Sequence, residues 1–426
     1  MIDINIILNN QKHVEELLKR KLFDVDLTEL VELVKERKTI LQSVEANKAK
    51  QNALSKSVPQ VKKEGGDVNK IFAKVKELGA LNKENEEKLK ELTDKINSIL
   101  FALPNLPDED LLPGGKENNK PVYTYKTKPE FGFKIKNHVE LAESLGLIDY
   151  DRGAKISGHG TWIYTGLGAQ LEWALINYFI SEHLKDGFEF ILPPHLLNYE
   201  SGFTAGQFPK FEEDVFVLKD VEPKKFMLPT AETALVNLHR NEILAEDQLP
   251  KKYFAYTPCY RKEAGSYRTE ERGMIRGYQF NKVEMVEYTA DNDSDRAFEE
   301  LLNKAKRLLE GLGLHYQISK LAAGDCSHSM ARTYDLEVYL PSIGIYKEVS
   351  SVSNARDYQA RRGQIRYKDS EGKMHFAHTL NGSGLATSRV FPAILEQYQQ
   401  EDGSVLVPEV LQPFMGGIKV LKPIKK

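Results

Sequence analysis

The chain has 426 residues, of which 41% are hydrophobic and 28% charged, and its formal net charge is −3. This length favours one large core plus an appendage, and the near-neutral charge excludes a globally basic protein, so any nucleic acid would have to bind a local patch. No run approaches the roughly 18 apolar residues of a membrane helix, and the N-terminus lacks a targeting composition. Cys259 and Cys326 are the two cysteines and form no CxxC pair. We therefore expect a cytoplasmic protein without a disulfide framework and without zinc.

The first hundred residues carry the pattern of two long helices. Apolar residues between 71 and 99 recur at two interleaved heptad positions, and a shorter stripe of the same kind covers residues 27–44. A breaker region with a proline and two glycines, residues 59–66, separates the stripes. The pattern predicts an antiparallel coiled-coil hairpin, an arm of about residues 27–100 within an N-terminal domain of residues 1–103.

The end of the predicted hairpin is basic. No Asp or Glu occurs between residues 48 and 63, and the five lysines there are Lys48, Lys50, Lys56, Lys62 and Lys63. Two interpretations stay open from these residues alone. The lysines either belong to a solvated helix tip, or they contact phosphates, because lysine clusters supply sequence-independent affinity for nucleic acids.

A segment rich in Pro, Asn and Gly, residues 104–130, is predicted to be a linker. Residues 131–426 then mix helical stretches, such as 169–184 and 294–309, with strand-like runs. The runs are Phe188–Leu192, Tyr253–Tyr260, Met274–Tyr288, Ala331–Tyr339, Ile345–Val349 and His375–Leu380. Several follow one another through hairpin-like loops without a helix after each. An α+β domain is therefore predicted, with helices against an antiparallel sheet rather than a doubly wound parallel sheet.

One predicted hairpin combines cations, carboxylates and an aromatic ring. Because strand side chains alternate between faces, Arg261 and Glu263 point the same way, and Arg276, Phe280 and Glu284 share one face of the returning strand. Such a surface offers a guanidinium for a phosphate, a ring on which a base can stack, and carboxylates for amines. It predicts a nucleotide site built on a hairpin, and the sequence contains neither a P-loop nor a GxGxxG motif.

Three further polar clusters each begin or end an apolar run. They are Thr230-Ala231-Glu232, Glu348-Val349-Ser350-Ser351, and the segment from Asn381 to Arg389. Together with the hairpin they form the candidate site.

In these motifs the chain resembles the seryl-tRNA synthetases of the bacterial and eukaryotic type, which are class II aminoacyl-tRNA synthetases. Residues 254–284 match motif 2, with its F/Y-R-x-E start and R-x-x-x-F return. Residues 378–395 match motif 3, with N-G-S-G-L-A and a closing arginine, and residues 193–211 are similar to motif 1. The arm is similar to the family's tRNA-binding domain, so the resemblance covers essentially the whole chain.

The resemblance implies a class II catalytic domain and a two-step reaction. L-serine and ATP would give seryl-adenylate and pyrophosphate, and serine would then pass to the 3′ end of tRNA(Ser); whether tRNA(Sec) is also charged stays open. A carboxylate is already a nucleophile near neutral pH, so the first step requires alignment and charge stabilisation rather than a general base. The resemblance also implies Mg²⁺ bound with ATP, and a homodimer that binds tRNA across its subunits.

The resemblance assigns roles to individual residues. Arg261 would hold the α-phosphate and the incoming carboxylate, Glu263 the adenine amino group, and Phe280 one face of the adenine. Arg389 would cover the other face and the γ-phosphate, which makes Arg261 and Arg389 the catalytic candidates. The ATP-binding candidates are Arg261, Lys262, Glu263, Arg276, Phe280, Glu348, Val349, Ser350, Ser351 and Arg389. Glu348 and Ser351 would also hold Mg²⁺, as oxygen donors suited to a hard cation.

Serine would be bound by Thr230, Ala231, Glu232, Glu284 and Ser383. Which carboxylate takes the amine and which the hydroxyl stays open. The tRNA would be bound by the five lysines of the arm.

Two other functions remain as alternatives. The first is a catalytically silent synthetase-like RNA-binding protein, against which the intact set of charged site residues argues. The second is an amino acid:carrier-protein ligase on the same catalytic fold. Such proteins lack the long arm, so the heptads of residues 71–99 count against it.

Overall fold

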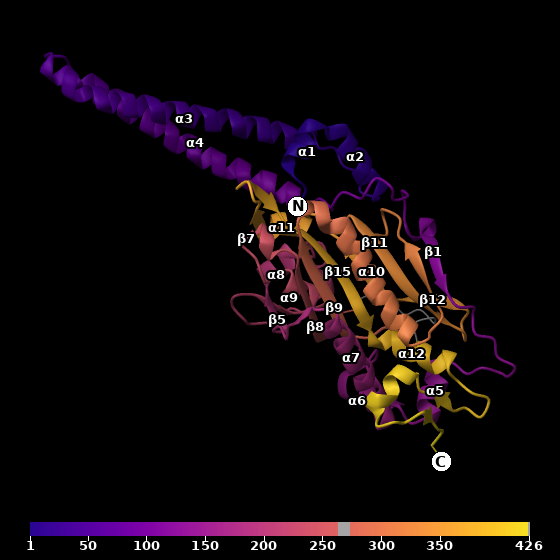
Figure 1. Ribbon diagram of the computed structural model, residues 1–426. Coiled ribbons are helices and arrows are strands. Elements are labelled where there is room, and N and C mark those ends of the chain that lie inside the picture. Colours follow the sequence, from indigo (N-terminus) through magenta and orange to yellow (C-terminus); the bar gives the residue numbers. More distant parts are fainter. Residues whose placement is uncertain (263–272, 425–426) are drawn as a thin grey trace. The chain divides into compact units, whose positions relative to one another are not determined.

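The computed structural model describes residues 1–262 and 273–424 (Figure 1). The chain folds into two compact units. The arm unit contains Ile2–Glu16 and Asp24–Leu103, and the sheet unit contains Met1, Leu17–Phe23 and Pro104–Lys426. Among the described residues, none of the helices is long and apolar enough to cross a membrane.

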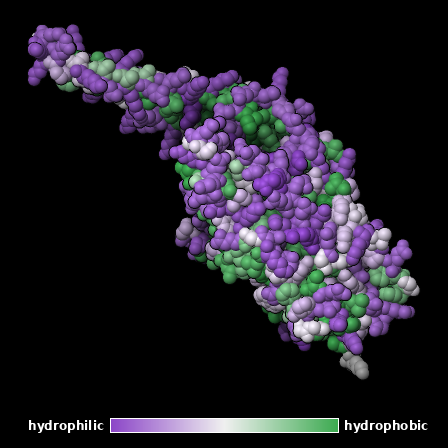
Figure 2. All heavy atoms as spheres, viewed as in Figure 1, coloured by the Kyte–Doolittle hydropathy of each residue, from purple (hydrophilic) through white to green (hydrophobic). Residues whose placement is uncertain are grey.

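Two long helices dominate the arm unit. After the short helices α1 (Ile4–Asn9) and α2 (Gln11–Arg20), α3 (Thr28–Lys63) and α4 (Val68–Ala102) pack against each other along their length (Figure 1). Their surface is mostly hydrophilic (Figure 2). A helix pair of this kind is stabilised chiefly by the apolar seam between the helices rather than by the propensity of either helix alone.

Contacts between α3 and α4 show the relative direction of the two helices. Nε of Arg37 donates to Oγ1 of Thr93 at 2.9 Å, and farther along α3, Nε2 of Gln51 donates to the carbonyl oxygen of Val75 at 2.9 Å. Partner numbers fall as residue numbers rise, so the helices are antiparallel. Asn82, one of the polar residues in the heptad register, donates to Gln51 at 3.3 Å. The predicted antiparallel coiled-coil hairpin is confirmed.

The turn between the two helices is shorter than predicted. Pro59 was expected in the breaker region, but α3 continues through it and ends at Lys63. Pro59 lies about one turn before the end of α3, where a proline removes a single intrahelical hydrogen bond. Gly65, with φ of 72°, reverses the chain, and Asp67 caps α4 by accepting from the backbone N–H of Asn69 at 3.0 Å.

An eight-stranded sheet forms the centre of the sheet unit (Figure 1). In spatial order its strands are β1 (Lys120–Tyr125), β10 (Tyr316–Lys320), β11 (Arg332–Leu340), β12 (Ile345–Asn354), β15 (His378–Ala386), β9 (Gln279–Thr289), β8 (Lys251–Tyr260) and β4 (Glu189–Phe190). All neighbours are antiparallel except β4 and β8. The predicted α+β class with an antiparallel sheet is confirmed.

Helices and small sheets surround this sheet. The helices are α5 (His138–Ser144), α6 (Tyr150–Ser157), α7 (Leu167–Lys185), α8 (Tyr199–Thr204), α9 (Glu232–Leu235), α10 (Ser294–Gly311), α11 (Tyr358–Gly363) and α12 (Thr387–Gln397). The small sheets pair β2 (Ile148–Asp149) with β3 (Ile163–Tyr164), β5 (Leu196–Asn198) with β6 (Lys225–Met227), β7 (Ile243–Ala245) with β13 (Arg366–Lys368) and β14 (Met374–Phe376), and β16 (Val405–Leu406) with β17 (Val420–Leu421).

The two faces of the large sheet differ in chemistry. One face packs against α7, α10 and α12 and carries most of the main hydrophobic core, whereas the alternating side chains of the other face include polar residues of the candidate site and a second apolar cluster. The fully buried apolar side chains of the first face include Phe254, Val283, Met285, Leu336, Val352 and Leu380. The polar residues of the second face therefore lie on a rigid support.

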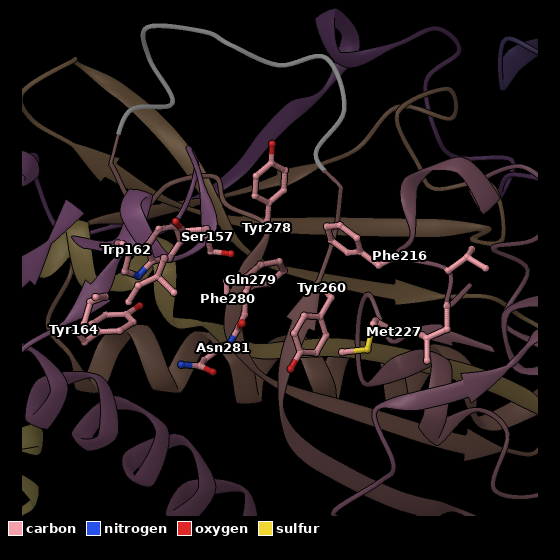
Figure 3. Close-up of a pocket in the computed structure, with 16 residues that line it drawn as sticks. Ser157, Trp162, Tyr164, Phe216, Met227, Tyr260, Tyr278, Gln279, Phe280 and Asn281 are labelled. Carbon is pink, nitrogen blue, oxygen red and sulfur yellow. The ribbon is translucent and has the colours of Figure 1, made fainter. Parts of the chain in front are cut away.

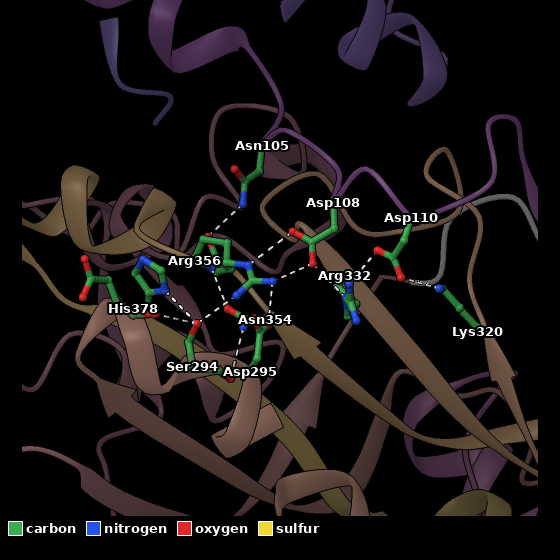
Figure 4. A network of polar contacts seen from close by, with 12 residues as sticks. Asn105, Asp108, Asp110, Ser294, Asp295, Lys320, Arg332, Asn354, Arg356 and His378 are labelled. Atoms are coloured by element: carbon green, nitrogen blue, oxygen red, sulfur yellow. Dashed lines mark hydrogen bonds and ion pairs between the residues drawn. The ribbon is translucent and has the colours of Figure 1, made fainter. Parts of the chain in front are cut away.

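The segment predicted as a linker, residues 104–130, contributes to the sheet unit. Its end forms β1, because a β-branched and aromatic run there pairs with β10. Its start is held by an ion-pair network (Figure 4): Asp108 contacts Arg332 at 2.8 Å and Arg356 at 2.7 Å, and Asp110 contacts Lys320 and Arg332, each at 2.5 Å. Sequence composition does not reveal these partners, which lie more than 200 positions away.

The predicted strand Met274–Tyr288 is shorter than expected. β9 begins at Gln279, and the residues before it form a turn. Gly273 has φ of 75°, and a side chain on Gly277 would meet the Trp162 ring at 2.3 Å. Arg276 therefore precedes the strand and does not share its alternation with Phe280, so this part of the prediction is wrong.

Candidate functional site

A buried carboxylate, Glu284 of β9, lies at the centre of the polar face. It is 0% exposed. Its Oε1 accepts from Nδ2 of Asn381 at 2.9 Å, its Oε2 accepts from Oγ of Ser383 at 3.0 Å, and Nζ of Lys282 lies 2.5 Å from Oε2. The sheet explains the arrangement, because Ser383 of β15 pairs directly with Glu284. Lys282 also donates to Oγ1 of Thr230 at 2.7 Å.

A second carboxylate faces the first. Glu232 begins α9 and is 8% exposed; Nε2 of Gln359 donates to its Oε1 at 2.8 Å, and Nδ2 of Asn381 lies 3.4 Å from its Oε2. Burial, followed by the charge of Glu284, raises the pKa of Glu232 to about 7. Both carboxylates contact the Asn381 amide, whereas Lys282 forms its ion pair with Glu284. The negative charge of Glu232 can therefore bind a second cation such as an amine.

The end of β8 carries the first predicted cation. Nε of Arg261 donates to the carbonyl oxygen of Pro229 at 3.1 Å, and its guanidinium lies 5.2 Å from the centre of the Phe280 ring. Lys262 follows, with its backbone N–H bonded to the carbonyl of Asp214 at 2.9 Å. Glu263, predicted to bind adenine, lies outside the described residues.

The start of α12 supplies the second predicted cation. Nη1 of Arg389 donates to the backbone carbonyl of Glu348 at 2.9 Å and lies 3.5 Å from its carboxylate. Nε of Arg389 also contacts the carbonyl of Ile275 at 3.5 Å. Arg389 thereby joins α12 to β12 and to the turn that contains Arg276.

An oxygen-rich group lies beside Arg389 on β11 and β12. Oγ of Ser351 donates to Oδ1 of Asp335 at 2.7 Å, and Glu348 pairs across the strands with Glu337. Burial, and then the charge of Glu348, raises the pKa of Asp335 well above its ordinary value. These are the hard oxygen donors that Mg²⁺ prefers, and a divalent cation would offset the crowding of their charges, so the residues fit this ion. No arrangement of three or more His, Cys, Asp or Glu side chains suited to a metal occurs within residues 1–262 and 273–424.

Three predicted site residues have side chains directed elsewhere. Val349 packs into the main hydrophobic core, and Ala231 packs into a second core cluster. Ser350 is buried and donates to the carbonyl oxygen of Ser383 at 2.6 Å. These residues can contribute to a ligand site only through their backbone or by holding their neighbours.

A cavity of about 620 Å³, here called the aromatic cavity because several aromatic rings line it, lies beside the start of β9 (Figure 3). Phe280 is the one described member of the predicted site that lines it. The other lining residues drawn with labels are Ser157, Trp162, Tyr164, Phe216, Met227, Tyr260, Tyr278, Gln279 and Asn281. The charged cluster around Glu284 is therefore a separate feature from this cavity.

The five predicted lysines of the arm lie along the C-terminal half of α3 and are exposed. Lys48 forms an ion pair with Glu86 of α4 at 2.7 Å, whereas Lys62 and Lys63 occupy the last turn of α3. An exposed pair of this kind contributes little to stability.

Sequence reasoning missed several residues of the cluster around Glu284. Lys282 lies two positions from Glu284 on β9, so the same period-2 rule could have found it. Asn381 begins the polar segment that was predicted as part of the site, but without a role of its own. Gln359 comes from α11, and no local pattern relates it to Glu232, 127 positions away. Asp335 likewise reaches Ser351 only through strand pairing.

Several known proteins are similar to this chain along its length. Residues 215–398 match the family model of the tRNA synthetase class II core domain (G, H, P, S and T), and residues 1–107 match the seryl-tRNA synthetase N-terminal domain. Serine–tRNA ligase 2 of Clostridium acetobutylicum is 59% identical, over 99% of this chain and 100% of the relative. Serine–tRNA ligase of Thermodesulfovibrio yellowstonii is 44% identical, over 98% and 99%.

Solved structures are similar over the same extent. The seryl-tRNA synthetase from Pyrococcus horikoshii complexed with ATP superposes with a TM-score of 0.93 at 31% identity, covering 100% of both chains. The cytoplasmic serine–tRNA ligase from Naegleria fowleri in complex with AMP superposes with a TM-score of 0.89 at 26% identity, covering 100% of this chain and 99% of the other.

Proposed function

The chain belongs to the seryl-tRNA synthetases, and on this premise we propose that it condenses L-serine with ATP and then transfers the seryl group to the 3′ end of tRNA(Ser). The observation that supports this most directly is the buried polar cluster of Glu284, Ser383, Asn381 and Glu232, whose charges suit a small zwitterion. Its central residue, Glu284, lies on β9, the strand that also carries Phe280 beside Arg261. We further propose that the sheet unit is the catalytic domain and the arm unit the tRNA-binding domain.

In the first step the serine carboxylate attacks the α-phosphorus of ATP. A carboxylate–phosphate bond forms, the bond between the α- and β-phosphates breaks, and pyrophosphate leaves with its charge. Arg261 would align the carboxylate with the α-phosphate, while Phe280 and Arg389 would hold the adenine between them. The chain's contribution is positioning and electrostatic stabilisation, and no side chain has to remove a proton from the nucleophile.

We propose that Glu348 and Ser351 hold Mg²⁺ with ATP, with Asp335 orienting the Ser351 hydroxyl through their hydrogen bond. When bound, Mg²⁺ would offset phosphate charge. Arg276 and Lys262, in the segments that flank the hairpin loop, would supply further positive charge near the phosphates. The role of Glu263 at the adenine amino group remains a prediction from the sequence.

Glu232 is the better candidate for the serine ammonium. Glu284 already accepts from Asn381 and Ser383 and is paired with Lys282, whereas the hydrogen bonds to the Glu232 carboxylate, within the described residues, come from the amides of Gln359 and Asn381. The hydroxyl of serine would then be read at Glu284 and Ser383, with Thr230 closing the pocket. Alanine would leave these buried polar groups unpaired, which is the physical basis of discrimination against it.

The affinity for serine should depend on pH through Glu232. Because the pKa of this carboxyl is raised to about 7, it is protonated below pH 7 and gains its charge as the pH rises. The KM for serine in pyrophosphate exchange is therefore expected to fall about tenfold from pH 6 to pH 8, at saturating ATP. Glu232→Gln should raise the KM and flatten this profile. A flat profile in the unmodified protein, or an unchanged one in the variant, would contradict the assignment.

Two further properties belong to this proposal. The resemblance of residues 193–211 to motif 1 supports a homodimer with tRNA bound across its subunits. Trp173 and Leu184 on α7, and Leu192 beyond it, are exposed apolar side chains that a partner subunit could cover. Cys259 and Cys326 are free and buried, which suits a reducing cytoplasm.

The function is tested by two assays on the full chain. Serine-dependent exchange of pyrophosphate into ATP, with Mg²⁺ present, is the expected result of the first. Aminoacylation of total tRNA with each amino acid in turn is the second, and serine alone should be attached. Absence of exchange in folded protein would favour the silent RNA-binding alternative, and attachment of another amino acid would overturn the assignment of the serine pocket.

A further inference from the structure

One buried carboxylate of the sheet unit lies outside the serine and ATP sites described above. Glu172, in the second turn of α7, is 3% exposed. Its Oε1 accepts from Nδ2 of Asn281 at 2.7 Å and from Oγ1 of Thr387 at 2.5 Å. Oγ1 of Thr387 also lies 3.2 Å from the backbone carbonyl oxygen of Asn281. Oδ1 of Asn281 also accepts from the Tyr256 hydroxyl at 3.2 Å, so the three residues form a hydrogen-bonded group that continues to β8.

The two residues that donate to Glu172 are neighbours of the groups proposed to enclose the adenine. Asn281 directly follows Phe280 in β9 (Figure 3), and Thr387 is the first residue of α12, two positions before Arg389. One carboxylate thus joins the strand that carries the stacking ring to the helix that carries the opposing guanidinium. This inference rests on the proposed function, since it concerns the same ATP site.

β15 leads directly into α12, and its pairing with β9 is irregular next to the Glu172 group. Ser383 of β15 pairs with Glu284 of β9, but the next pair is Ala386 with Lys282, so β15 carries an extra residue in between. A bulge of this kind interrupts the regular ladder of backbone hydrogen bonds. The Glu172 group lies just beyond the bulge, where backbone pairing no longer sets the spacing of β9 and α12.

Burying the Glu172 carboxylate costs free energy of folding, which packing alone does not require. Burial raises the pKa of Glu172 to about 7, and an apolar side chain of similar volume would avoid that penalty. The hydroxyl of Tyr164, another lining residue of the aromatic cavity, lies close enough that burial and the charge of Glu172 both raise its pKa. The other carboxylate oxygen, Oε2, is buried and has no hydrogen-bond partner among the described residues, so the two donors to Oε1 fix the orientation of the carboxylate.

We propose that Glu172 is a positioning residue for ATP: by receiving both Asn281 and Thr387 on one oxygen, it sets the distance between Phe280 and Arg389 and hence the fit of the adenine ring. Glu172 does not touch the nucleotide itself. Loss of the Glu172 carboxylate should therefore weaken the binding of ATP but not of serine, because the cluster around Glu284 has its own hydrogen bonds.

The test compares two variants of the full chain in pyrophosphate exchange at one pH. Glu172→Leu removes the acceptor, and the KM for ATP is expected to rise on the order of tenfold or more, since small displacements of binding groups have effects of this size. Its KM for serine should stay within about threefold on the same argument. Glu172→Gln keeps an oxygen that accepts from Asn281 and Thr387, and it should restore the KM for ATP to near that of the unmodified protein.

A second pair of variants covers the case in which Glu172→Leu does not fold. Thr387→Val removes one donor and should raise the KM for ATP, whereas Thr387→Ser keeps the hydroxyl and should not. A matched control is Glu396→Gln at the other end of α12, where a fully buried carboxylate accepts from His138 and Ser342. It should lower thermal stability without changing the KM for ATP.

Each outcome has one meaning. If the unmodified protein shows no exchange, the proposed function fails. If it shows exchange but the Leu and Val variants change the KM values for ATP and serine equally, or lower only kcat and stability, Glu172 has a general structural role and the inference is wrong. Failure of Glu172→Gln to restore ATP affinity would also overturn it.

Discussion

Replacing Arg261 by alanine is expected to abolish serine activation, lowering kcat/KM for pyrophosphate exchange by about a thousandfold or more. Arg261 extends from the end of β8, is held by the carbonyl of Pro229, and lies beside the Phe280 ring. In the proposed reaction it meets both the serine carboxylate and the α-phosphate, the two anions that must approach each other. Without this guanidinium, the repulsion between the serine carboxylate and the α-phosphate would oppose the attack.

Two further variants define what Arg261 contributes. Arg261→Lys keeps the charge but loses the planar fork that can bind both anions, so an intermediate loss is expected. Arg296→Ala removes an exposed arginine of α10, which pairs with Asp293 and Glu300, and should leave exchange unchanged. Exchange by Arg261→Ala at more than about a tenth of the original rate would show that this guanidinium does not stabilise the reacting phosphate.

Shortening the arm should abolish attachment of serine to tRNA while serine activation continues. The contacts Arg37–Thr93 and Lys48–Glu86 show which residues of α3 and α4 face each other. Replacing residues 41–89 by a short glycine-serine turn would therefore join the helices at the same level and retain the buried residues of their base. Loss of charging is expected to be complete, since the protein would lose its main contact with tRNA, whereas the rate of exchange should stay within about twofold because no residue proposed to bind serine or ATP is removed.

The lysines of the arm can be tested without shortening it. Changing Lys48, Lys50, Lys56, Lys62 and Lys63 together to glutamine should weaken tRNA binding and reduce its dependence on salt, because fewer counterions would be released. The matched variant with five arginines keeps the charge and should bind tRNA nearly as well.

Full charging activity by the protein with the shortened arm would show that the arm does not bind the substrate tRNA.

Local sequence patterns predicted the main helices and strands because apolar residues repeat in them with a regular helical or strand period. The heptads of residues 71–99 led correctly to the arm, and the alternation of β9 correctly grouped Phe280 with Glu284 on one face. The prediction failed for Arg276, where Gly273 and the close approach of Gly277 to Trp162 end the strand. It also missed β1, a short strand whose partner, β10, lies about 190 residues later.

The sequence by itself determined the class of fold and the residue types of the candidate site, because period, composition and motif order are properties of the chain alone. Only the tertiary structure decided which buried polar groups meet: Gln359 with Glu232, and Glu172 with the neighbours of Phe280 and Arg389. The physical reason is that a buried polar group must find its partner in space. When that partner is a hundred or more residues away, strand pairing and helix packing choose it, and no local pattern records the choice.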